Sequence, residues 1–305
     1  MSLADKRIQD PVLTQLALGY HNAELVGDYL FPIVEIPKEA GKIPQFGRLA
    51  FRQQSTVREV LGKSNRLTPE DITSISIELE ENDLEYPIDY RESHEASYPL
   101  KQYALSVVQD SLALGREITA AKIAQNSDNY PSENVSSLAG KNKFSHKESN
   151  PLETFDNAIS VISASIGKKP NVCVISEDVW KVLKNNPSIL DRIKYTKTGI
   201  LTPSVFAELI DVPNVKIASA SEEKSGELHK IWENCVILAY VSTRSKGQGT
   251  IFDPSYGYTV RRKQGLFVDT YHESGGKIEL IRCTDISKPY LVGKSAGFLM
   301  KDCIE

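Results

Sequence analysis

Five histidines and one short polar cluster are the places where this chain of 305 residues could do chemistry. The histidines stand too far apart for a short metal-binding spacing, at His21, His94, His146, His229 and His272. A nucleophile with its base can be imagined near the last of them, where His272 and Ser274 follow Asp269. That stretch is short and flanked by glycine, so a turn explains their proximity better than a catalytic triad does.

Glycine loops and cysteine pairs are other common signs of a chemical site, and they also give no specific evidence for one here. The segment KGQGT at 246–250 follows an apolar strand pattern but leads into another strand, which favours a flexible loop over a phosphate cradle. The motifs HExxH, GxSxG, GxxxxGKS/T and a helix-opening GxGxxG do not occur. The four cysteines form no CxxC pair, and Cys173 and Cys235 stand in apolar runs typical of buried thiols. We therefore predict no enzyme activity, no cofactor and no metal site.

The composition is that of a soluble globular protein, with 40% hydrophobic and 25% charged residues and a net charge of -4. A length of 305 residues suits one large unit or two domains. No apolar run reaches the roughly 18 to 20 residues that cross a bilayer, and the start MSLADKRIQDP lacks the apolar stretch of a signal peptide, so we expect a cytosolic origin. The slight acidity argues against a protein whose main task is to grip nucleic acid.

Charge is distributed unevenly, in two adjacent blocks of opposite sign. In the basic block, residues 47–66, five bases against one acid give a net charge of +4, and the bases are Arg48, Arg52, Arg58, Lys63 and Arg66. In the acidic block, residues 67–95, ten acids against one arginine give -9, and the acids include Glu78, Glu80, Glu81, Asp83 and Glu85. Such blocks either fold back on each other or pair with the opposite block of a neighbouring copy, unless they are simply solvated surface. These bases and acids are our candidates for contacts between subunits.

The elements around the charge blocks are an arm, a hairpin and a long helix. Prolines and glycines interrupt residues 1–46, which predicts an extended arm buried on its own domain or a partner through Leu13, Leu16, Leu18, Tyr20, Tyr29, Leu30 and Phe31. Alternating polarity, clearest in ITSISIEL, predicts a long hairpin over 47–80 with its tip near 62–65. Helical spacing predicts one helix over about 98–126, with Ser97 as its N-cap and an apolar face of Leu100, Tyr103, Ala104, Val107, Leu114, Ile118 and Ala121.

After a polar loop at 127–150, helices and strands follow in mixed order, which defines an α+β fold. A helix with Phe155, Ile159, Ile162 and Ile166 on one face is expected to end at Gly167 in a left-handed cap. The buried strand NVCVIS follows, then a short helix capped by Ser176 and stopped by Pro187, and another that starts with Thr202 and Pro203. Further strands are predicted at VKIAS, CVILAY, YTVRR and KIELIRCT.

Several segments in a fixed order resemble the major capsid proteins of tailed bacteriophages, which have the Hong Kong ninety-seven fold. The most specific are DPVLTQLALGYHNAELVGDYLFPIV, KEAGKIPQFGRLAFR, GKKPNVCVISEDVWKVLKNNPSILDRIKYTKTGILTPSVFAELIDV and, near the end, IFDPSYGYTVRR. The resemblance implies an N-terminal arm (1–46), an extended β-hairpin loop (47–80), a peripheral domain (81–150 and 277–305) with a spine helix at about 98–126, and an axial domain (151–276).

The resemblance also implies a structural role, in which copies of the chain form hexamers and pentamers that close an icosahedral shell around packaged double-stranded DNA. The expected location is the virion capsid, assembled in the cytoplasm of a bacterial host. Expected partners are the chain itself, a scaffolding protein and a portal, with room for a decoration protein. Contact with DNA is expected to be non-specific, and no membrane contact is expected.

Two properties of some relatives are not expected here. The arm motif starts within the first ten or so residues, so we expect no N-terminal processing and a separate scaffolding protein. Lys63 and Asn65 lie near the predicted tip, but no matching set of Lys, Asn and Glu can be assigned, so we expect no covalent crosslinking. Two alternatives stay open: an encapsulin-like bacterial compartment of the same fold, and an α/β hydrolytic enzyme that uses His272 or Ser274.

Overall fold

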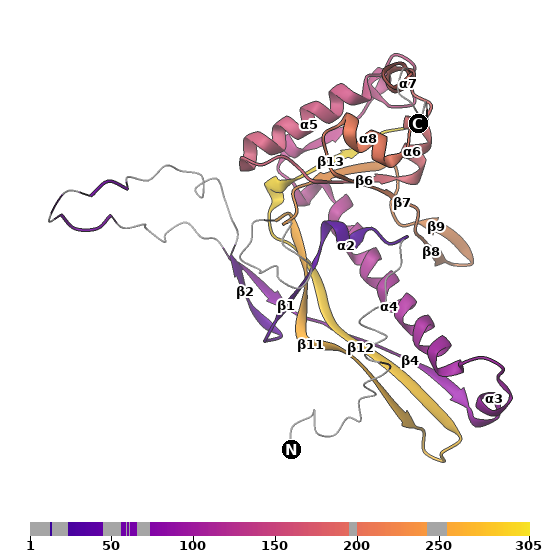
Figure 1. Ribbon diagram of the computed structural model, residues 1–305. Coiled ribbons are helices and arrows are strands. Elements are labelled where there is room, and N and C mark those ends of the chain that lie inside the picture. The colour runs from indigo at the N-terminus through magenta and orange to yellow at the C-terminus, as the bar shows by residue number, and fades with distance from the viewer. Residues whose placement is uncertain are drawn as a thin grey trace.

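The computed structural model describes residue 13 and residues 24–44, 56–58, 60, 62–65, 74–194, 200–242 and 255–305. Over these ranges, a four-stranded sheet of order β1-β11-β12-β4 and a five-stranded sheet of order β5-β13-β10-β6-β7 form two lobes. One long helix, α4 (Leu100–Gln125), runs along the first lobe and reaches the second (Figure 1). This mixed architecture confirms the predicted α+β class.

The four-stranded sheet is built on two long strands. β11 (Gly257–His272) and β12 (Ile278–Leu291) pair antiparallel. β4 (Glu81–Asp89) pairs antiparallel with the other side of β12, and β1 (Ile33–Ile36) runs parallel to β11. Among the described residues, β4 and β1 are therefore the two edges of this sheet.

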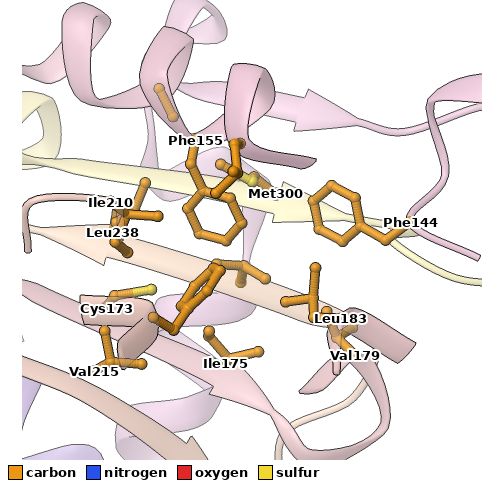
Figure 2. Close-up of a cluster of buried hydrophobic side chains, with 14 of the residues drawn as sticks. Phe144, Phe155, Cys173, Ile175, Val179, Leu183, Ile210, Val215, Leu238 and Met300 are labelled. Atoms are coloured by element: carbon orange, nitrogen blue, oxygen red, sulfur yellow. The ribbon is translucent and has the colours of Figure 1, made fainter. Parts of the chain in front are cut away.

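The five-stranded sheet is covered on both faces, which explains the unbroken apolar sequences of its central strands. Its strands are β5 (Val135–Ser137), β13 (Gly297–Lys301), β10 (Cys235–Ala239), β6 (Val172–Ser176) and β7 (Asn214–Ala218). One face packs in the core of Figure 2 against α5 (Pro151–Ile166), α6 (Glu177–Leu183), α7 (Pro187–Ile193) and α8 (Pro203–Leu209). The other face packs against the C-terminal part of α4 and the described end of the arm.

The remaining elements are short. They are α2 (Gly27–Leu30), β2 (Ala40–Pro44), β3 (Ser74–Glu78), α3 (Tyr90–Glu95), the hairpin β8 (Ser221–Lys224) with β9 (Glu227–Lys230), and 3₁₀ helices at Ser127–Asn129, Ser132–Asn134, Gly140–Asn142 and Lys294–Ala296. None of the helices described here combines the length and the apolar character that crossing a bilayer requires.

Two predicted helix boundaries are confirmed in detail. α5 ends at Gly167, whose φ of 66° is the left-handed cap expected there. At the start of α8 the Thr202 hydroxyl accepts a hydrogen bond from the backbone N–H of Val205 (3.3 Å). Both boundaries depend on local geometry alone, which is why the residue types predicted them.

Three other predicted boundaries need correction. α4 begins after Pro99 without any side-chain cap, so Ser97 is not its N-cap. Ser176 precedes α6 as predicted, but its hydroxyl accepts from the backbone N–H of Cys235 (3.2 Å) instead of capping the helix. Pro187 is the first residue of α7, since its fixed φ suits a first helical turn, and the Asn186 side chain caps that helix.

The long helix has the predicted length, and the face that it buries is partly the predicted one. Ala104 and Ala121 are buried as predicted, and Leu100, Leu114 and Ile118 pack partly buried against the cores. Of the predicted apolar face, Tyr103 is 49% exposed and Val107 is only half-buried. The buried positions are Ala104, Leu105, Val108, Gln109, Ala113, Glu117, Ala120, Ala121 and Ala124. The small alanine side chains allow α4 to pack close to both sheets. Apolar residues lie on two faces of the helix, so their spacing alone did not show which face is buried.

The described part of the arm is anchored inside the body. Leu13, Leu30 and Phe31 are buried as predicted, Tyr29 is half-buried, and Leu16, Leu18 and Tyr20 lie outside the described residues. Phe31 packs against Gly257, where a Cβ would come within 2.4 Å of the Phe31 ring. The absence of a side chain at this position of β11 therefore makes room for the arm.

The hairpin starts earlier than predicted. β2 pairs antiparallel with β3, from Ala40 opposite Glu78 to Pro44 opposite Ser74, so the pairing begins before residue 47. Residues 45–55 and 66–73 lie outside the described ranges. The described part of the tip projects far from both lobes (Figure 1).

The sheets suggest a different division of the chain from the predicted domains. The boundary at 276 and 277 falls in the turn that joins β11 to β12, and it would divide a paired hairpin. β13 belongs to the five-stranded sheet, although it lies in the C-terminal part assigned to the peripheral domain. We therefore propose a peripheral lobe of 81–125 with 257–291, and an axial lobe of 130–242 with 297–305.

Candidate assembly surface

The tip of the hairpin is a closed and highly exposed loop. Arg58 Nη1 donates to the carbonyl of Gly62 (2.6 Å), and Asn65 Nδ2 donates to the carbonyl of Val57 (3.0 Å). Val57 and Val60 are 84% and 92% exposed. Apolar side chains this exposed on a projecting element are typical of a surface that contacts another molecule.

The structure places only two of the five basic candidates. Arg58 and Lys63 lie on the exposed tip. Arg48, Arg52 and Arg66 fall outside the described residues. Of the basic block at 47–66, the structure therefore places two side chains, and the other three are known from the sequence alone.

The acidic candidates lie on or beside β4, the edge strand of the four-stranded sheet. Glu80 forms an ion pair with Lys288 of β12, and Glu85 accepts from the Tyr271 hydroxyl (2.5 Å). Glu78 lies at the end of β3, where its backbone N–H donates to the Tyr290 hydroxyl (2.8 Å). These contacts hold the start of the acidic block against the body and leave much of its surface exposed.

Asp83 and Glu81 complete this acidic edge. Asp83 accepts from the Thr284 hydroxyl (3.1 Å) and lies 3.9 Å from Arg282. Burial is the main reason that the pKa of Asp83 is raised, and the charges of Glu81 and Asp269 act in the same direction. Asp83 is therefore held within its own chain by Thr284 and Arg282 of β12.

The imagined nucleophile triad does not form. Arg282 Nε and Nη2 donate to the two carboxylate oxygens of Asp269 (3.0 and 2.5 Å), so this carboxylate is already engaged. Because side chains alternate along β11, Asp269 and His272 also point to opposite faces of the sheet. The loop 246–250 lies outside the described residues.

The cysteines are buried, as predicted for Cys173 and Cys235. Burial raises the pKa of all four thiols, to about 12 for Cys235 and Cys283. Thiols of this kind are poor nucleophiles and poor metal ligands. Within the described ranges, no group of three or more His, Cys, Asp or Glu side chains is arranged to hold a metal ion.

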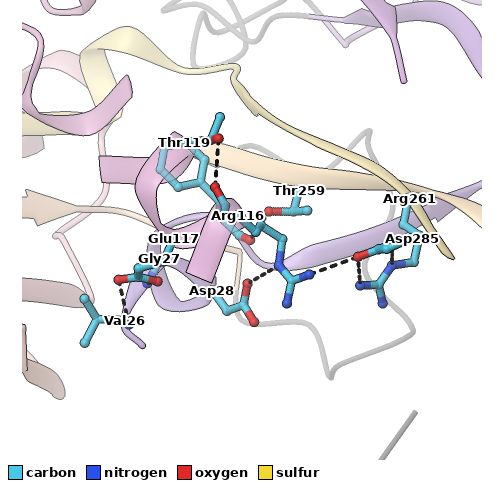
Figure 3. Close-up of polar contacts among 11 residues, drawn as sticks. Val26, Gly27, Asp28, Arg116, Glu117, Thr119, Thr259, Arg261 and Asp285 are labelled. Atoms are coloured by element: carbon cyan, nitrogen blue, oxygen red, sulfur yellow. Dashed lines mark hydrogen bonds and ion pairs between the residues drawn. The ribbon is translucent and has the colours of Figure 1, made fainter. Parts of the chain in front are cut away.

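A buried charge cluster, which the sequence did not predict, joins the arm to the spine helix and the long strands (Figure 3). Asp285 on β12 accepts from Arg261 Nε and Nη2 (both 2.8 Å) and from Arg116 Nη1 (2.9 Å). Arg116 on α4 also lies 3.6 Å from Asp28 on α2. Asp28 is 43% exposed and lies at the open end of the cluster, whereas Asp285 and Arg261 are buried, and each of these buried charges has a partner of opposite sign.

Glu117, the next residue on α4, holds the arm directly (Figure 3). Its carboxylate accepts from the backbone N–H groups of Val26 (3.0 Å) and Gly27 (2.7 Å) and from the indole N–H of Trp232 (2.7 Å). Burial raises the pKa of Glu117, and the three hydrogen bonds oppose that shift. A Cβ on Gly27 would lie 2.7 Å from this carboxylate, so glycine permits the close approach.

One sequence signal could have pointed to these residues. Arg116 and Glu117 are the only charged residues between Asp110 and Lys122, in the otherwise uncharged stretch SLALGREITAA. Charges in a long apolar helix that packs on both sheets require buried partners. The partners themselves, on α2, β11 and β12, are not visible from this stretch.

Two lobes joined by a spine helix, with a buried arm and a projecting hairpin, define a shell protein of the Hong Kong ninety-seven fold. No family model matches the chain. It is, however, 43% identical over 301 residues to the major capsid protein of Burkholderia phage BcepMu, covering 98% of this chain and 97% of that protein. The chain therefore belongs to the family of phage major capsid proteins, whose copies build the capsid of the virion.

Solved structures agree with this assignment. A phage-related protein from Bordetella bronchiseptica RB50 has a TM-score of 0.83 and 26% identity, covering 97% of this chain and 98% of that chain. The capsid of cyanophage P-SCSP1u has a TM-score of 0.59 at 10% identity, covering 92% of this chain and 89% of that chain. The second likeness shows the fold alone.

Proposed function

We propose that this capsid protein forms hexamers and pentamers that close an icosahedral shell around packaged double-stranded DNA in the cytoplasm of a bacterial host. The observation that carries the proposal is the hairpin tip, where Val57 and Val60 are exposed beside Arg58 and Lys63. A surface of this kind is unfavourable on an isolated subunit and becomes buried when subunits associate. Similarity to a phage head protein favours this function over an encapsulin-like compartment.

Within the shell, the basic block of one subunit faces the acidic block of a neighbour. Support comes from the partners that the described acids have in their own chain. Glu80 pairs with Lys288 on β12, and Glu85 accepts from Tyr271 on β11. Neither partner belongs to the basic block at 47–66. An exposed ion pair contributes only about 0 to 1 kcal/mol, but a set repeated around every capsomer fixes the register of the subunits. Arg48, Arg52 and Arg66 belong to the same proposed contact.

The other partners follow from the same function. A scaffolding protein and a portal take part in assembly, and a decoration protein can bind the finished shell. Contact with DNA is weak and independent of sequence, because the chain carries a net charge of -4 and no strongly basic surface is needed to enclose DNA. Nuclease-protected DNA in purified particles supports a phage head, whereas enclosed enzyme cargo supports the compartment.

Reversing the two placed tip charges is expected to impair assembly and to leave the subunit folded. In the double variant Arg58→Glu with Lys63→Glu, the tip is acidic and is repelled by the acidic block of the neighbouring subunit. Shells should therefore form only at a subunit concentration about tenfold or more above that of the wild type. Electron microscopy of the purified, overexpressed protein measures shell yield, and circular dichroism checks the fold.

The matched control reverses two exposed lysines away from the hairpin, Lys147→Glu with Lys169→Glu. This variant changes the net charge by the same amount and should assemble close to wild type. Normal shells from the tip variant would rule out the proposed charge contact. Monomeric wild-type protein at all concentrations would rule out the proposed assembly itself.

A further inference from the structure

A short hairpin of β8 and β9 projects from the axial lobe. It follows β7, which is one edge of the five-stranded sheet among the described residues. Leu228 on β9 is 78% exposed, so its own chain buries little of this apolar side chain. A two-stranded hairpin by itself is only marginally stable in water, so both features favour a partner that packs on it.

The β8–β9 hairpin is held in a fixed orientation. Gly226 adopts a φ of 88° in its turn, and the Gly226 N–H donates to the Glu223 carboxylate (2.6 Å). At the base, Lys230 Nζ donates to Glu177 (2.7 Å) and Asp178 (2.6 Å), both on α6. These contacts order the hairpin before it meets a partner, which lowers the entropy cost of association.

A groove of about 640 Å³ opens at the other edge of the same sheet, between β5 and α5. Its apolar part is formed by Val135, Leu138, Val161 and Phe298. Leu138 and Phe298 belong to the core below, whereas Val135 and Val161 are only half-buried. An apolar side chain from outside would complete the burial of these two valines.

The hairpin and this β5 groove lie on opposite sides of the axial lobe. The strand order β5-β13-β10-β6-β7 puts β5 and β7 at the two edges of the sheet in the described part of the chain. The hairpin projects on the β7 side, away from β13 (Figure 1). Two different surfaces on opposite sides of one subunit meet when copies are related by rotation, and such head-to-tail contacts close into rings.

The charges beside Leu228 match one rim of the groove. Glu223 lies directly opposite Leu228 across the two strands, so both side chains share one face of the hairpin. The groove has Lys141 on one rim and Glu153 on the other. Lys141 pairs with Glu148 where these side chains are 77% and 68% exposed, a pair that is easily exchanged. Attraction to Lys141 and repulsion from Glu153 therefore orient the hairpin in the groove.

We propose that Leu228 of the β8–β9 hairpin inserts into the β5 groove of the next copy of this chain in the capsomer ring, with Glu223 against Lys141. This inference rests on the proposed shell function. It specifies a contact between axial lobes, separate from the long hairpin of β2 and β3.

Disulfide trapping tests this contact directly. In Glu227→Cys with Asn157→Cys, one cysteine is next to Leu228 and the other is an exposed position of α5 that lines the groove. Leu228 itself is kept. The four native cysteines are buried with raised pKa values, so they do not compete.

The size of the covalent products shows whether the contact lies within a ring. Each subunit carries one cysteine of each kind, so oxidised shells should give a ladder on non-reducing denaturing gels that ends at pentamers and hexamers. Reductant should remove it. Monomers, a ladder that stops at dimers, or a ladder that continues beyond hexamers would overturn the contact and leave the shell function intact. Failure of the wild-type chain to form shells would instead overturn the proposed function.

The matched control is Glu227→Cys with Ala164→Cys. Ala164 is an exposed residue about two turns further along α5, and it does not line the groove. Shells of this pair should give monomers on the same gels. The same ladder from both pairs would show that the cysteines react without a specific contact, against the proposal.

A second variant, Leu228→Ser, separates the fold from the contact. Because Leu228 is 78% exposed, the unfolding midpoint of the subunit should stay unchanged, whereas the concentration needed for assembly should rise about tenfold or more. The control is His229→Ser, an exposed residue on the opposite face of β9, which should assemble close to wild type. Assembly of Leu228→Ser at the wild-type concentration would contradict the proposal.

Discussion

Replacing Asp285 with asparagine is expected to lower the free energy of unfolding by about 3 to 5 kcal/mol. Asparagine has nearly the same shape, so the loss comes from charge and not from a cavity. Its single carbonyl oxygen cannot accept the two N–H groups of Arg261 and the one from Arg116, and its NH₂ group faces a guanidinium. Positive charge then remains in a site where Asp285 and Arg261 are 2% and 9% exposed.

Chemical denaturation of the purified chain, followed by circular dichroism, measures this loss. The matched control is Asp211→Asn, since Asp211 pairs with Lys169 Nζ at 2.6 Å and these side chains are 80% and 68% exposed. At φ 53°, asparagine is tolerated as well as aspartate at that position. The control should lose far less stability than Asp285→Asn, because exposed ion pairs contribute little, and equal losses in both variants would contradict the role of the buried cluster.

A double variant tests whether unpaired charge is the cause. Arg261→Met with Asp285→Leu removes both ends of the bidentate pair and replaces them with apolar side chains. It should lose less stability than the sum of the two single variants, because Arg261 and Asp285 no longer leave each other's charge buried alone and Arg116 still has Asp28 beside it. Additive losses would point to shape and packing as the cause.

Replacing Glu117 with alanine is expected to cost about 3 to 5 kcal/mol, because three buried donors lose their acceptor at once. Glu117→Gln is the sharper variant. Its carbonyl oxygen can keep the donors Val26 N and Trp232 Nε1, but its NH₂ group then faces the N–H of Gly27, and we expect a loss of about 1 to 3 kcal/mol.

The losses at Glu117 should appear locally as well as globally. Hydrogen exchange should increase over residues 24–31, and the fluorescence of Trp232 should shift as its indole N–H loses its acceptor. Asp110→Ala is the control, an exposed acid on the same helix, with an expected effect within about 0.5 kcal/mol. Unchanged exchange over the arm in Glu117→Gln would show that Glu117 does not hold it.

The pKa of Glu117 also gives this residue a pH dependence of defined sign. Burial raises the pKa above the ordinary value of 4.5, so the native state binds the proton more tightly than the unfolded chain does. This contribution to stability is fully present in acid and is lost as pH rises from about 4.5 through the folded pKa. The stability difference between wild type and Glu117→Gln should therefore be larger near about pH 4 than near about pH 7.

Local sequence patterns predicted many of the helices and strands, but not all of the segments against which they pack. The strands β6 and β10 and the helix α5 follow from runs of apolar residues and from Gly167. β4 was missed, because its exposed, acidic sequence lacks the alternation of a half-buried strand. Its strand conformation comes from pairing with β12, a contact with a distant part of the chain.

The candidate site was likewise predictable from the sequence only in part. The opposed charge blocks are visible in the sequence, and so is the resemblance to phage head proteins that the 43% identical relative confirms. The charge cluster around Asp285 is not visible, because its members come from α2, α4, β11 and β12, which are separate segments. The sequence shows Arg116 and Glu117 in an otherwise uncharged part of a helix, and only the structure shows which groups pair with them.

By itself, the sequence determined the family, the α+β class, the existence of the long helix and the opposed charges, since these depend on neighbouring residues and their order. The tertiary structure decided which face of α4 is buried and which groups meet Asp285 and Glu117. Burying a charge requires a partner, and these partners come from the arm, β11 and the segment of Trp232. Their meeting depends on strand register and on how α4 crosses both sheets, which no local pattern specifies.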